Sequence, residues 1–221
     1  MLNIKKFVCN MFQENCYVVS DETDECIIID CGTFFEEEKK SLAEYIKSNG
    51  LKPKHLLCTH GHVDHNFGNK FVYDEFGLQP EISQADEQLI NSLSTQAKAF
   101  TGMECTIDVP PVGSYIDEKS KIIFGSHGIT VISTPGHSPG SVFFYCKEEA
   151  LAFSGDTLFN MSVGRTDLGL GDFDELMKSL GRIAESLPQD TTILPGHGPK
   201  TNIGFETSYN PYLKAVKKTN G

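Results

Sequence analysis

The sequence predicts a layered α/β protein, in which two β-sheets pack face to face and helices cover their outer surfaces. Short runs rich in apolar and β-branched residues recur in both halves of the chain, and in each half an amphipathic helix follows them. The chain has 221 residues, of which 39% are hydrophobic and 22% charged, a composition typical of a globular domain with its own core. We expect one domain spanning 1–221, with two pseudo-symmetric halves at about 1–120 and 121–221.

The first half should open with three strands and a helix. Turn residues at 21–24 separate the second strand from the third, and Leu42, Tyr45 and Ile46 lie on one face of the helix. Pro53 is expected to interrupt the chain before the next strand. The expected elements are strands at 2–8, 16–20 and 25–30, a helix at 35–48, a strand at 55–59, a polar loop at 60–66 and a helix ending at Phe76 before Gly77.

The segment 84–120 has no single period. A helix is expected at 85–94, and the residues after it alternate neither as a strand nor as a helix. Long irregular segments inside compact domains often cover active sites, so we interpret 84–120 as a lid.

The second half repeats the order of strands followed by a helix. Asp172 is the expected N-cap of the helix Phe173–Ser186. Strands are expected at 121–125, 128–133, 141–146, 150–154 and 192–194, and a short helix at the C-terminus. Periodicity supports this layered arrangement, but it does not choose the topology.

Charge and composition exclude several kinds of partner. The chain has 19 basic and 30 acidic residues, a formal net charge of −11, which disfavours nucleic-acid binding. No apolar run approaches 18 residues, and no apolar segment follows Lys5 and Lys6, so neither a membrane partner nor a signal peptide is expected. Seven scattered cysteines without CxxC spacing indicate buried, reduced thiols, and we expect a cytoplasmic protein.

Four candidate metal ligands lie within six residues of one another, directly after an apolar strand: His60, His62, Asp64 and His65. Gly61 would let the backbone turn sharply, so that the first two imidazoles converge on one point. Imidazole and carboxylate together suit zinc, iron or manganese.

Three more candidates, His137, Asp156 and His197, follow other apolar strands. Each stands after a turn that contains glycine, and proline precedes both Gly136-His137 and Gly196-His197. His55 and His127 do not occur in this context, and we interpret them as structural or surface residues.

An HxHxDH motif followed by a distant histidine, an aspartate and a histidine resembles the metallo-β-lactamase superfamily, and the resemblance covers the whole chain. The sequences Gly-Asp-Thr-Leu-Phe at 155–159 and Ser-Val-Gly-Arg at 162–165 resemble the glyoxalase II branch. So does the ending, with Gly-Pro at 198–199, Thr201, Glu206 and Asn-Pro-Tyr-Leu at 210–213, which is similar to small glyoxalase II-like hydrolases.

The resemblance implies an αββα sandwich with the site at one edge, between the two halves. It implies two divalent ions per chain, and we expect zinc, with iron or manganese as alternatives. Asp64 and Asp156 would be the catalytic carboxylates. In the implied division, the first ion is held by His60, His62 and His137, the second by Asp64, His65 and His197, and Asp156 bridges them together with a hydroxide.

The implied activity is hydrolysis of a hydroxyacyl thioester, a small molecule such as lactoylglutathione. Two alternatives use the same fold: a persulfide dioxygenase with a single iron, and a hydrolase of lactones or other esters. The complete second group of ligands favours two metals over one. A non-catalytic binding module would lack some of the ligands, all of which are present.

Arg165 is the candidate substrate-binding cation. It lies in the loop where the family has a lysine or arginine for the glutathione carboxylate. The alternative is a structural salt bridge with Asp167 or Asp172.

Overall fold

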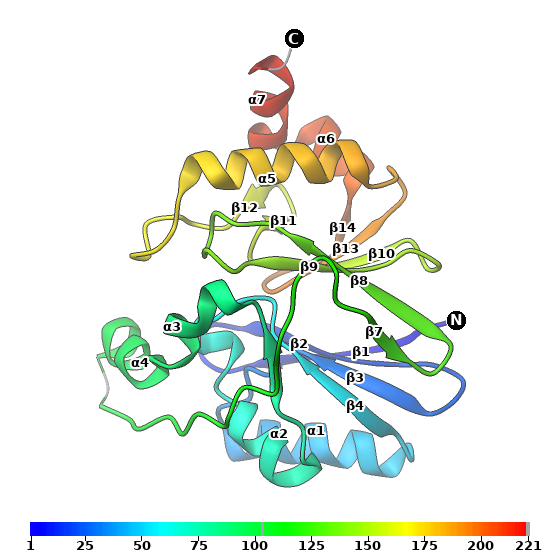
Figure 1. Cartoon of the computed structure of the whole chain (residues 1–221), viewed down its shortest axis with the longest axis vertical. Helices are drawn as coiled ribbons and strands as arrows, with labels where there is room; N and C mark the ends of the chain where they lie inside the picture. Colours follow the sequence, from blue (N-terminus) through cyan, green and yellow to red (C-terminus); the bar gives the residue numbers. More distant parts are fainter. Residues whose placement is uncertain (103, 220–221) are drawn as a thin grey trace.

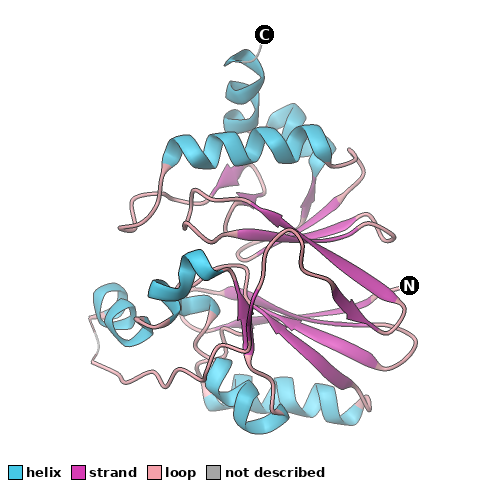
Figure 2. Cartoon of the chain, in the orientation of Figure 1, coloured by secondary structure: helices cyan, strands magenta, loops and turns pink. Residues whose placement is uncertain are grey.

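The computed structural model describes residues 1–102 and 104–219, and it has the expected α/β layers. Two sheets face each other, and helices cover the outer face of each (Figure 1; Figure 2). The prediction of an αββα sandwich is therefore confirmed.

The first sheet comes from the N-terminal part of the chain. Its strands pair antiparallel from β1 to β3 and parallel from β3 to β6. In spatial order they are β1 (Asn3–Cys9), β2 (Glu14–Ser20), β3 (Glu25–Ile29), β4 (Lys52–Leu57), β5 (Pro80–Ile82) and β6 (Ser114–Tyr115). Its outer face is covered by α1 (Glu36–Ser48) and α2 (Asn69–Phe76) (Figure 1).

The second sheet comes from the C-terminal part of the chain. β10 and β13 pair parallel, and the other neighbours pair antiparallel. In spatial order the strands are β14 (Thr201–Asn202), β13 (Thr192–Pro195), β10 (Leu151–Gly155), β9 (Val142–Cys146), β8 (His127–Ser133) and β7 (Ile122–Phe124). Its outer face is covered by α5 (Phe173–Ser186), α6 (Ile203–Tyr209) and α7 (Pro211–Thr219), and a hairpin of β11 (Leu158–Phe159) and β12 (Ser162–Val163) projects beside it.

Alternation along the strands produces the layers. In β2, Tyr17 and Val19 pack into the core between the sheets, whereas Cys16 and Val18 pack beneath the helices of the first sheet. In α5, Leu176, Leu180 and Ile183 recur at helical spacing and pack on the second sheet. Both faces of each sheet are thus buried.

Several sequence predictions agree with the structure closely. The helix at Phe173–Ser186 has the expected bounds, and the side chain of Asp172 accepts a hydrogen bond from Glu175 N at 3.0 Å. Gly77, with φ of 72°, ends α2 as expected. Six of the seven thiols are buried, and Cys105 is half-buried.

The prediction for Pro53 was wrong. Pro53 lies inside β4, opposite Cys26, where the register between β3 and β4 shifts. Proline has no N–H to donate, and a strand irregularity of this kind tolerates that loss.

The segment 84–120 contains more structure than its sequence indicated. The helix expected at 85–94 is divided into a short 3-10 turn (Gln84–Asp86) and α3 (Glu87–Ile90), and a further helix, α4 (Leu93–Thr101), follows. These helices lie at one edge of the sandwich (Figure 1). None of the helices in the described part of the chain has the length and apolar character needed to span a membrane.

Candidate metal centre

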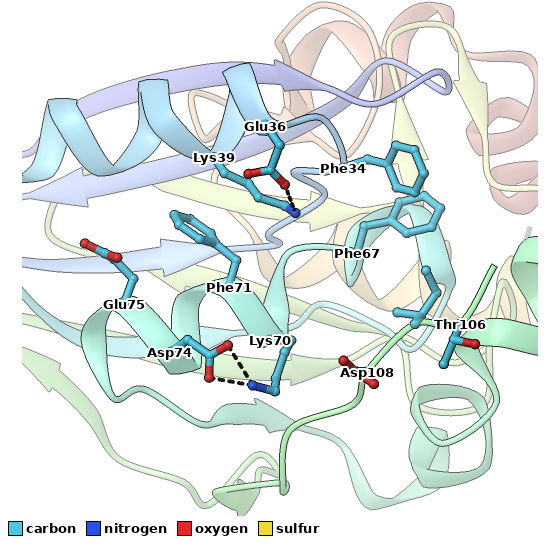
Figure 3. A pocket seen from close by; sticks show the side chains of 11 residues that line it. Phe34, Glu36, Lys39, Phe67, Lys70, Phe71, Asp74, Glu75, Thr106 and Asp108 are labelled. Atoms are coloured by element: carbon cyan, nitrogen blue, oxygen red, sulfur yellow. Dashed lines mark hydrogen bonds and ion pairs between the residues drawn. The ribbon is translucent and has the colours of Figure 1, made fainter.

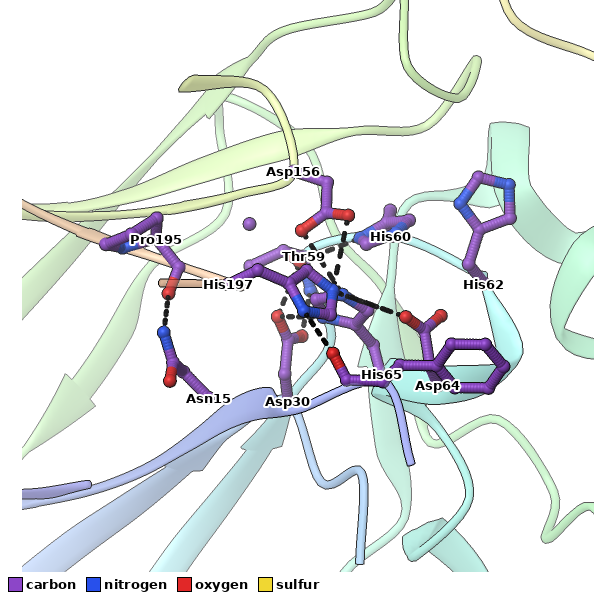
Figure 4. Close-up of polar contacts among 12 residues, drawn as sticks. Asn15, Asp30, Thr59, His60, His62, Asp64, His65, Asp156, Pro195 and His197 are labelled. Atoms are coloured by element: carbon purple, nitrogen blue, oxygen red, sulfur yellow. Dashed lines mark hydrogen bonds and ion pairs between the residues drawn. The ribbon is translucent and has the colours of Figure 1, made fainter. Parts of the chain in front are cut away.

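Strand ends from both sheets meet at the edge where the candidate ligands lie. The loop with His60 follows β4, and His137, Asp156 and His197 follow β8, β10 and β13. The parallel pairs β3–β4 and β10–β13 direct their carboxyl ends to this same edge, so the structure brings all the predicted ligand residues together. Figure 4 shows His60, His62, Asp64, His65, Asp156 and His197 among them.

His60, His62 and His137 form the first group. One nitrogen of each ring lies within 4.8 Å of the others, and all three residues are buried. His62 Nδ1 and His137 Nε2 are 2.8 Å apart. The three nitrogens can therefore share one cation.

Asp64, His65 and His197 form the second group. His197 Nε2 lies 3.3 Å from both Asp64 Oδ2 and His65 Nε2. Their ligand atoms also fall within 4.8 Å of one another.

Asp156 lies between the two groups. Its Oδ2 is 3.7 Å from His137 Nε2 and 3.6 Å from His197 Nε2, and its Oδ1 is 3.3 Å from His65 Nε2. One carboxylate thus reaches ligand nitrogens of both groups. Figure 4 shows it beside His65 and His197 of the second group.

Buried polar atoms without partners indicate that the site fits cations. His60 Nε2 and Asp156 Oδ1 are buried and have no hydrogen-bond partner. The opposite nitrogens are engaged: His60 Nδ1 contacts Thr59 Oγ1 at 3.0 Å, and His197 Nδ1 contacts the Phe12 carbonyl at 3.1 Å. Such contacts direct the free lone pair of each ring into the site.

The protonation of the first group also suits metal binding. Burial lowers the pKa of His60 well below its usual range and that of His62 to about 4, so both rings are neutral. Burial acts in the same direction on His65, but Asp156, Asp64 and Asp30 outweigh it and raise the pKa of His65 well above its usual range. A cation bound by His65 would compete with a proton for its ring nitrogen.

Asp30 supports the second group, and the sequence analysis missed it. Its carboxylate accepts from Thr59 N at 2.7 Å and Thr59 Oγ1 at 2.6 Å, and it lies 2.9 Å from His65 Nδ1 (Figure 4). Asp30 directly follows a strand, as Asp156 does, and this shared context was a signal that could have identified it.

Asp86 connects the two loops of the first group. This buried carboxylate accepts from Gly61 N at 2.8 Å, Gly140 N at 2.6 Å and Ser138 Oγ at 2.6 Å. Nothing in the sequence around Asp86 indicated this role.

As predicted, His60 and His62 converge on one point across Gly61. The φ of Gly61 is not in the left-handed region. Instead, a Cβ at this position would lie 2.6 Å from Leu89 Cβ, so Gly61 provides space for α3 behind the histidine loop.

A pocket of about 680 Å³ opens over the two groups. Asp64 and Asp156 lie in its wall, and Ala99 and Phe100 of α4 form another part. The segment interpreted as a lid therefore contributes to the pocket, and its role as a lid stays a prediction.

Arg165 lines this pocket and forms a salt bridge with Asp167, which was the alternative to its role in substrate binding. Its guanidinium donates to both carboxylate oxygens of Asp167, at 2.6 and 2.8 Å, whereas Asp172 caps α5. Its carbonyl lies 2.7 Å from His137 Nδ1. Its role in substrate binding stays a prediction.

His55 and His127 lie apart from the two groups. His55 contacts Glu81 at 2.5 Å, and His127 contacts Asp21 at 3.1 Å and Glu149 at 3.3 Å.

A second hollow of about 400 Å³ lies beside α1 and α2 (Figure 3). Its lysines are paired within the hollow, Lys39 with Glu36 and Lys70 with Asp74. None of the candidate metal ligands lines it.

The model of the metallo-beta-lactamase superfamily matches residues 9–197. A probable metallo-hydrolase of Bacillus subtilis, YqgX, is 34% identical over 203 residues, which are 91% of this chain and 92% of the relative. The hydroxyacylglutathione hydrolase GloC of Haemophilus influenzae is 33% identical over 216 residues, which are 97% of this chain and 99% of the relative.

Two solved structures are similar along nearly their whole length. The B3 metallo-beta-lactamase BLEG-1 has a TM-score of 0.86 and 33% identity, with 96% of this chain and 99% of that chain covered. TTHA1623 in a di-iron-bound form has a TM-score of 0.84 and 34% identity, with coverage of 95% and 100%.

Proposed function

Because this chain belongs to the metallo-β-lactamase superfamily and is a metallo-hydrolase, we propose that it holds two metal ions and cleaves a hydroxyacyl thioester such as lactoylglutathione. The observation that carries the proposal is the position of Asp156 between two complete groups of ligand atoms. The similarity to a hydroxyacylglutathione hydrolase along 97% of the chain supports a thioester as the substrate.

We assign one ion to each of the two groups of residues. His60, His62 and His137 would hold one ion, Asp64, His65 and His197 the other, with Asp156 common to both. When bound, two such ions polarise a carbonyl and provide a hydroxide nucleophile at neutral pH. We propose zinc; the di-iron form of a similar structure makes iron the main alternative.

The side chains of this chain orient the reactants. Asp64 and Asp156 both border the pocket, so their carboxylates can orient the attacking oxygen toward a carbonyl carbon. A thiolate leaves without much help from a general acid, because thiols are far more acidic than alcohols. This site needs no further acid for a thioester.

The test is a metal-replete assay after elemental analysis. Protein purified without chelator should contain two ions per chain, and it should hydrolyse lactoylglutathione. Other thioesters, lactones, a β-lactam and glutathione persulfide are assayed beside it. One tightly held iron with persulfide oxidation would identify the dioxygenase instead, and cleavage confined to lactones or β-lactams would refute thioester hydrolysis.

A further inference from the structure

The pocket wall beyond the metal ligands is mainly apolar. Six side chains from four segments of the chain form it: Phe12, Ala99, Phe100, Phe159, Val163 and Leu168. The same four segments also expose large apolar side chains, at Met11, Phe100, Met161 and Leu170. A wall of this kind binds groups that water solvates poorly.

Apolar side chains flank both groups of ligands. The ring of Phe100 lies 6.5 Å from that of His62, in the first group. The ring of Phe159 lies 6.2 Å from that of His197, in the second. A carbonyl placed between the groups therefore has apolar surface toward its acyl side and toward its leaving group.

Charge recognition is weak in the same pocket. Among the described residues that line it, Arg165 is the one lysine or arginine, and both oxygens of Asp167 already accept from its guanidinium. The formal net charge of −11 also disfavours the approach of anions. Bound metal ions would add positive charge at the reacting carbonyl, but not along the wall beyond it.

We infer that this pocket selects thioesters whose acyl and thiol groups are uncharged and apolar, and that the two carboxylates of a glutathione thioester are poorly bound. This inference rests on the proposed thioester hydrolysis and specifies its substrate class. Lactoylglutathione is then a slow, weakly bound substrate of a site that prefers longer, neutral thioesters.

The first measurement varies the acyl chain at constant thiol. Acetyl, butyryl and hexanoyl thioesters of N-acetylcysteamine are hydrolysed by the metal-loaded enzyme. We expect kcat/KM to rise about two- to fourfold per methylene, because a fully buried methylene contributes about fourfold. The lactoyl thioester of N-acetylcysteamine should also be a better substrate than lactoylglutathione.

Matched variants assign the effect to the wall. Phe100→Ala should flatten the chain-length dependence. Phe205→Ala is the control, since Phe205 is 39% exposed, as Phe100 is, but lies outside the pocket. Equal flattening in both variants would remove Phe100 from the explanation and contradict the inference.

Thiol binding gives a readout that needs no turnover. Calorimetry of the metal-loaded protein with ethanethiol, butanethiol, hexanethiol and glutathione should show affinity rising with alkyl length, with glutathione weaker than hexanethiol. Tighter binding of glutathione, lost in Arg165→Ala, would overturn the inference and support Arg165 as the anion site. Strong hexanethiol binding without cleavage of any thioester would refute the proposed reaction and leave the apolar site standing.

Discussion

The carboxylate of Asp156 lies within 3.7 Å of nitrogens from both groups of ligands. In the proposed site with two ions, its loss would remove an anionic partner from both ions at once. We expect Asp156→Ala to hold less than one ion per chain by elemental analysis. Its turnover should fall by more than about 100-fold, which exceeds the usual effect of removing a residue that only hydrogen-bonds to a metal ligand. His55→Ala should keep its metal content; two retained ions in Asp156→Ala would show that the assignment is wrong.

At Asp86, one side chain determines the spacing of two loops. Asp86→Ala leaves the Gly61 and Gly140 N–H groups and the Ser138 hydroxyl without their acceptor. We expect a loss of at least about 2 kcal/mol in unfolding free energy, and affinity for one ion of the two weakened about 10- to 100-fold in metal titrations.

Asp86→Asn keeps one oxygen and should recover part of both losses. If Asp86→Ala keeps full stability and unchanged affinity for both ions, Asp86 does not support the metal centre.

Between elements, His55 of β4 connects Glu81 of β5 to the carbonyl of Ile123 in β7. The hydrogen bond to Glu81 raises the pKa of His55. When folding raises the pKa of a histidine, its protonated form stabilises the folded state. This stabilisation is fully present below the pKa of the unfolded state and is lost as the pH rises through the pKa of the folded state.

In metal-free protein, wild type should therefore be more stable than His55→Gln. This difference in unfolding free energy should be about 1 kcal/mol larger at pH 5.5 than at pH 9. Denaturant titrations at the two pH values measure this difference. A pH-independent difference would mean that the contact acts through packing alone.

Another contact between elements holds the hairpin of β11 and β12 in place. Buried Glu206 of α6 accepts from Met161 N at 3.0 Å and from Asn210 Nδ2 at 2.8 Å, and Asn210 also donates to the Ser162 carbonyl. This hairpin contributes Phe159 and Val163 to the pocket.

Glu206→Ala should raise KM for the preferred thioester roughly tenfold, equivalent to about 1.4 kcal/mol, while two ions remain bound. Glu206→Gln should recover part of the loss, and Glu185→Ala, on the exposed face of α5, should behave as wild type. Loss of metal from Glu206→Ala would indicate that the hairpin supports the ligands and not the substrate.

For the whole molecule, the candidate metal centre lies between the two halves of the chain. Four of the predicted ligands come from the first half, and the other three, His137, Asp156 and His197, come from the second. Ions bound only by the folded state stabilise it by about 4 kcal/mol when free metal is 1,000 times Kd.

Chelation should then lower Tm by roughly 8 to 16 °C for a chain of this size. Calorimetric scans with and without chelator, followed by addition of zinc, test the effect and its reversal. An unchanged Tm would mean that the ions contribute little to joining the halves.

The sequence by itself determined the layered class and the identity of the candidate ligands. Alternation in strands and the spacing of Leu176, Leu180 and Ile183 are local patterns, so secondary structure can be predicted from them directly. The strand-end positions of His60, His137, Asp156 and His197 followed from the same patterns, because parallel strands end at one edge of a sheet.

Only the tertiary structure decided which groups support those ligands. Asp86 and Ser138 are 52 residues apart, and Asp30 and His65 are 35 apart, so their contacts depend on how distant loops pack. The pairing of Arg165 with Asp167 and the apolar wall around it were decided in the same way. Sequence patterns encode which residues a strand presents at its end, whereas the surroundings of those residues form only when the two sheets close on each other.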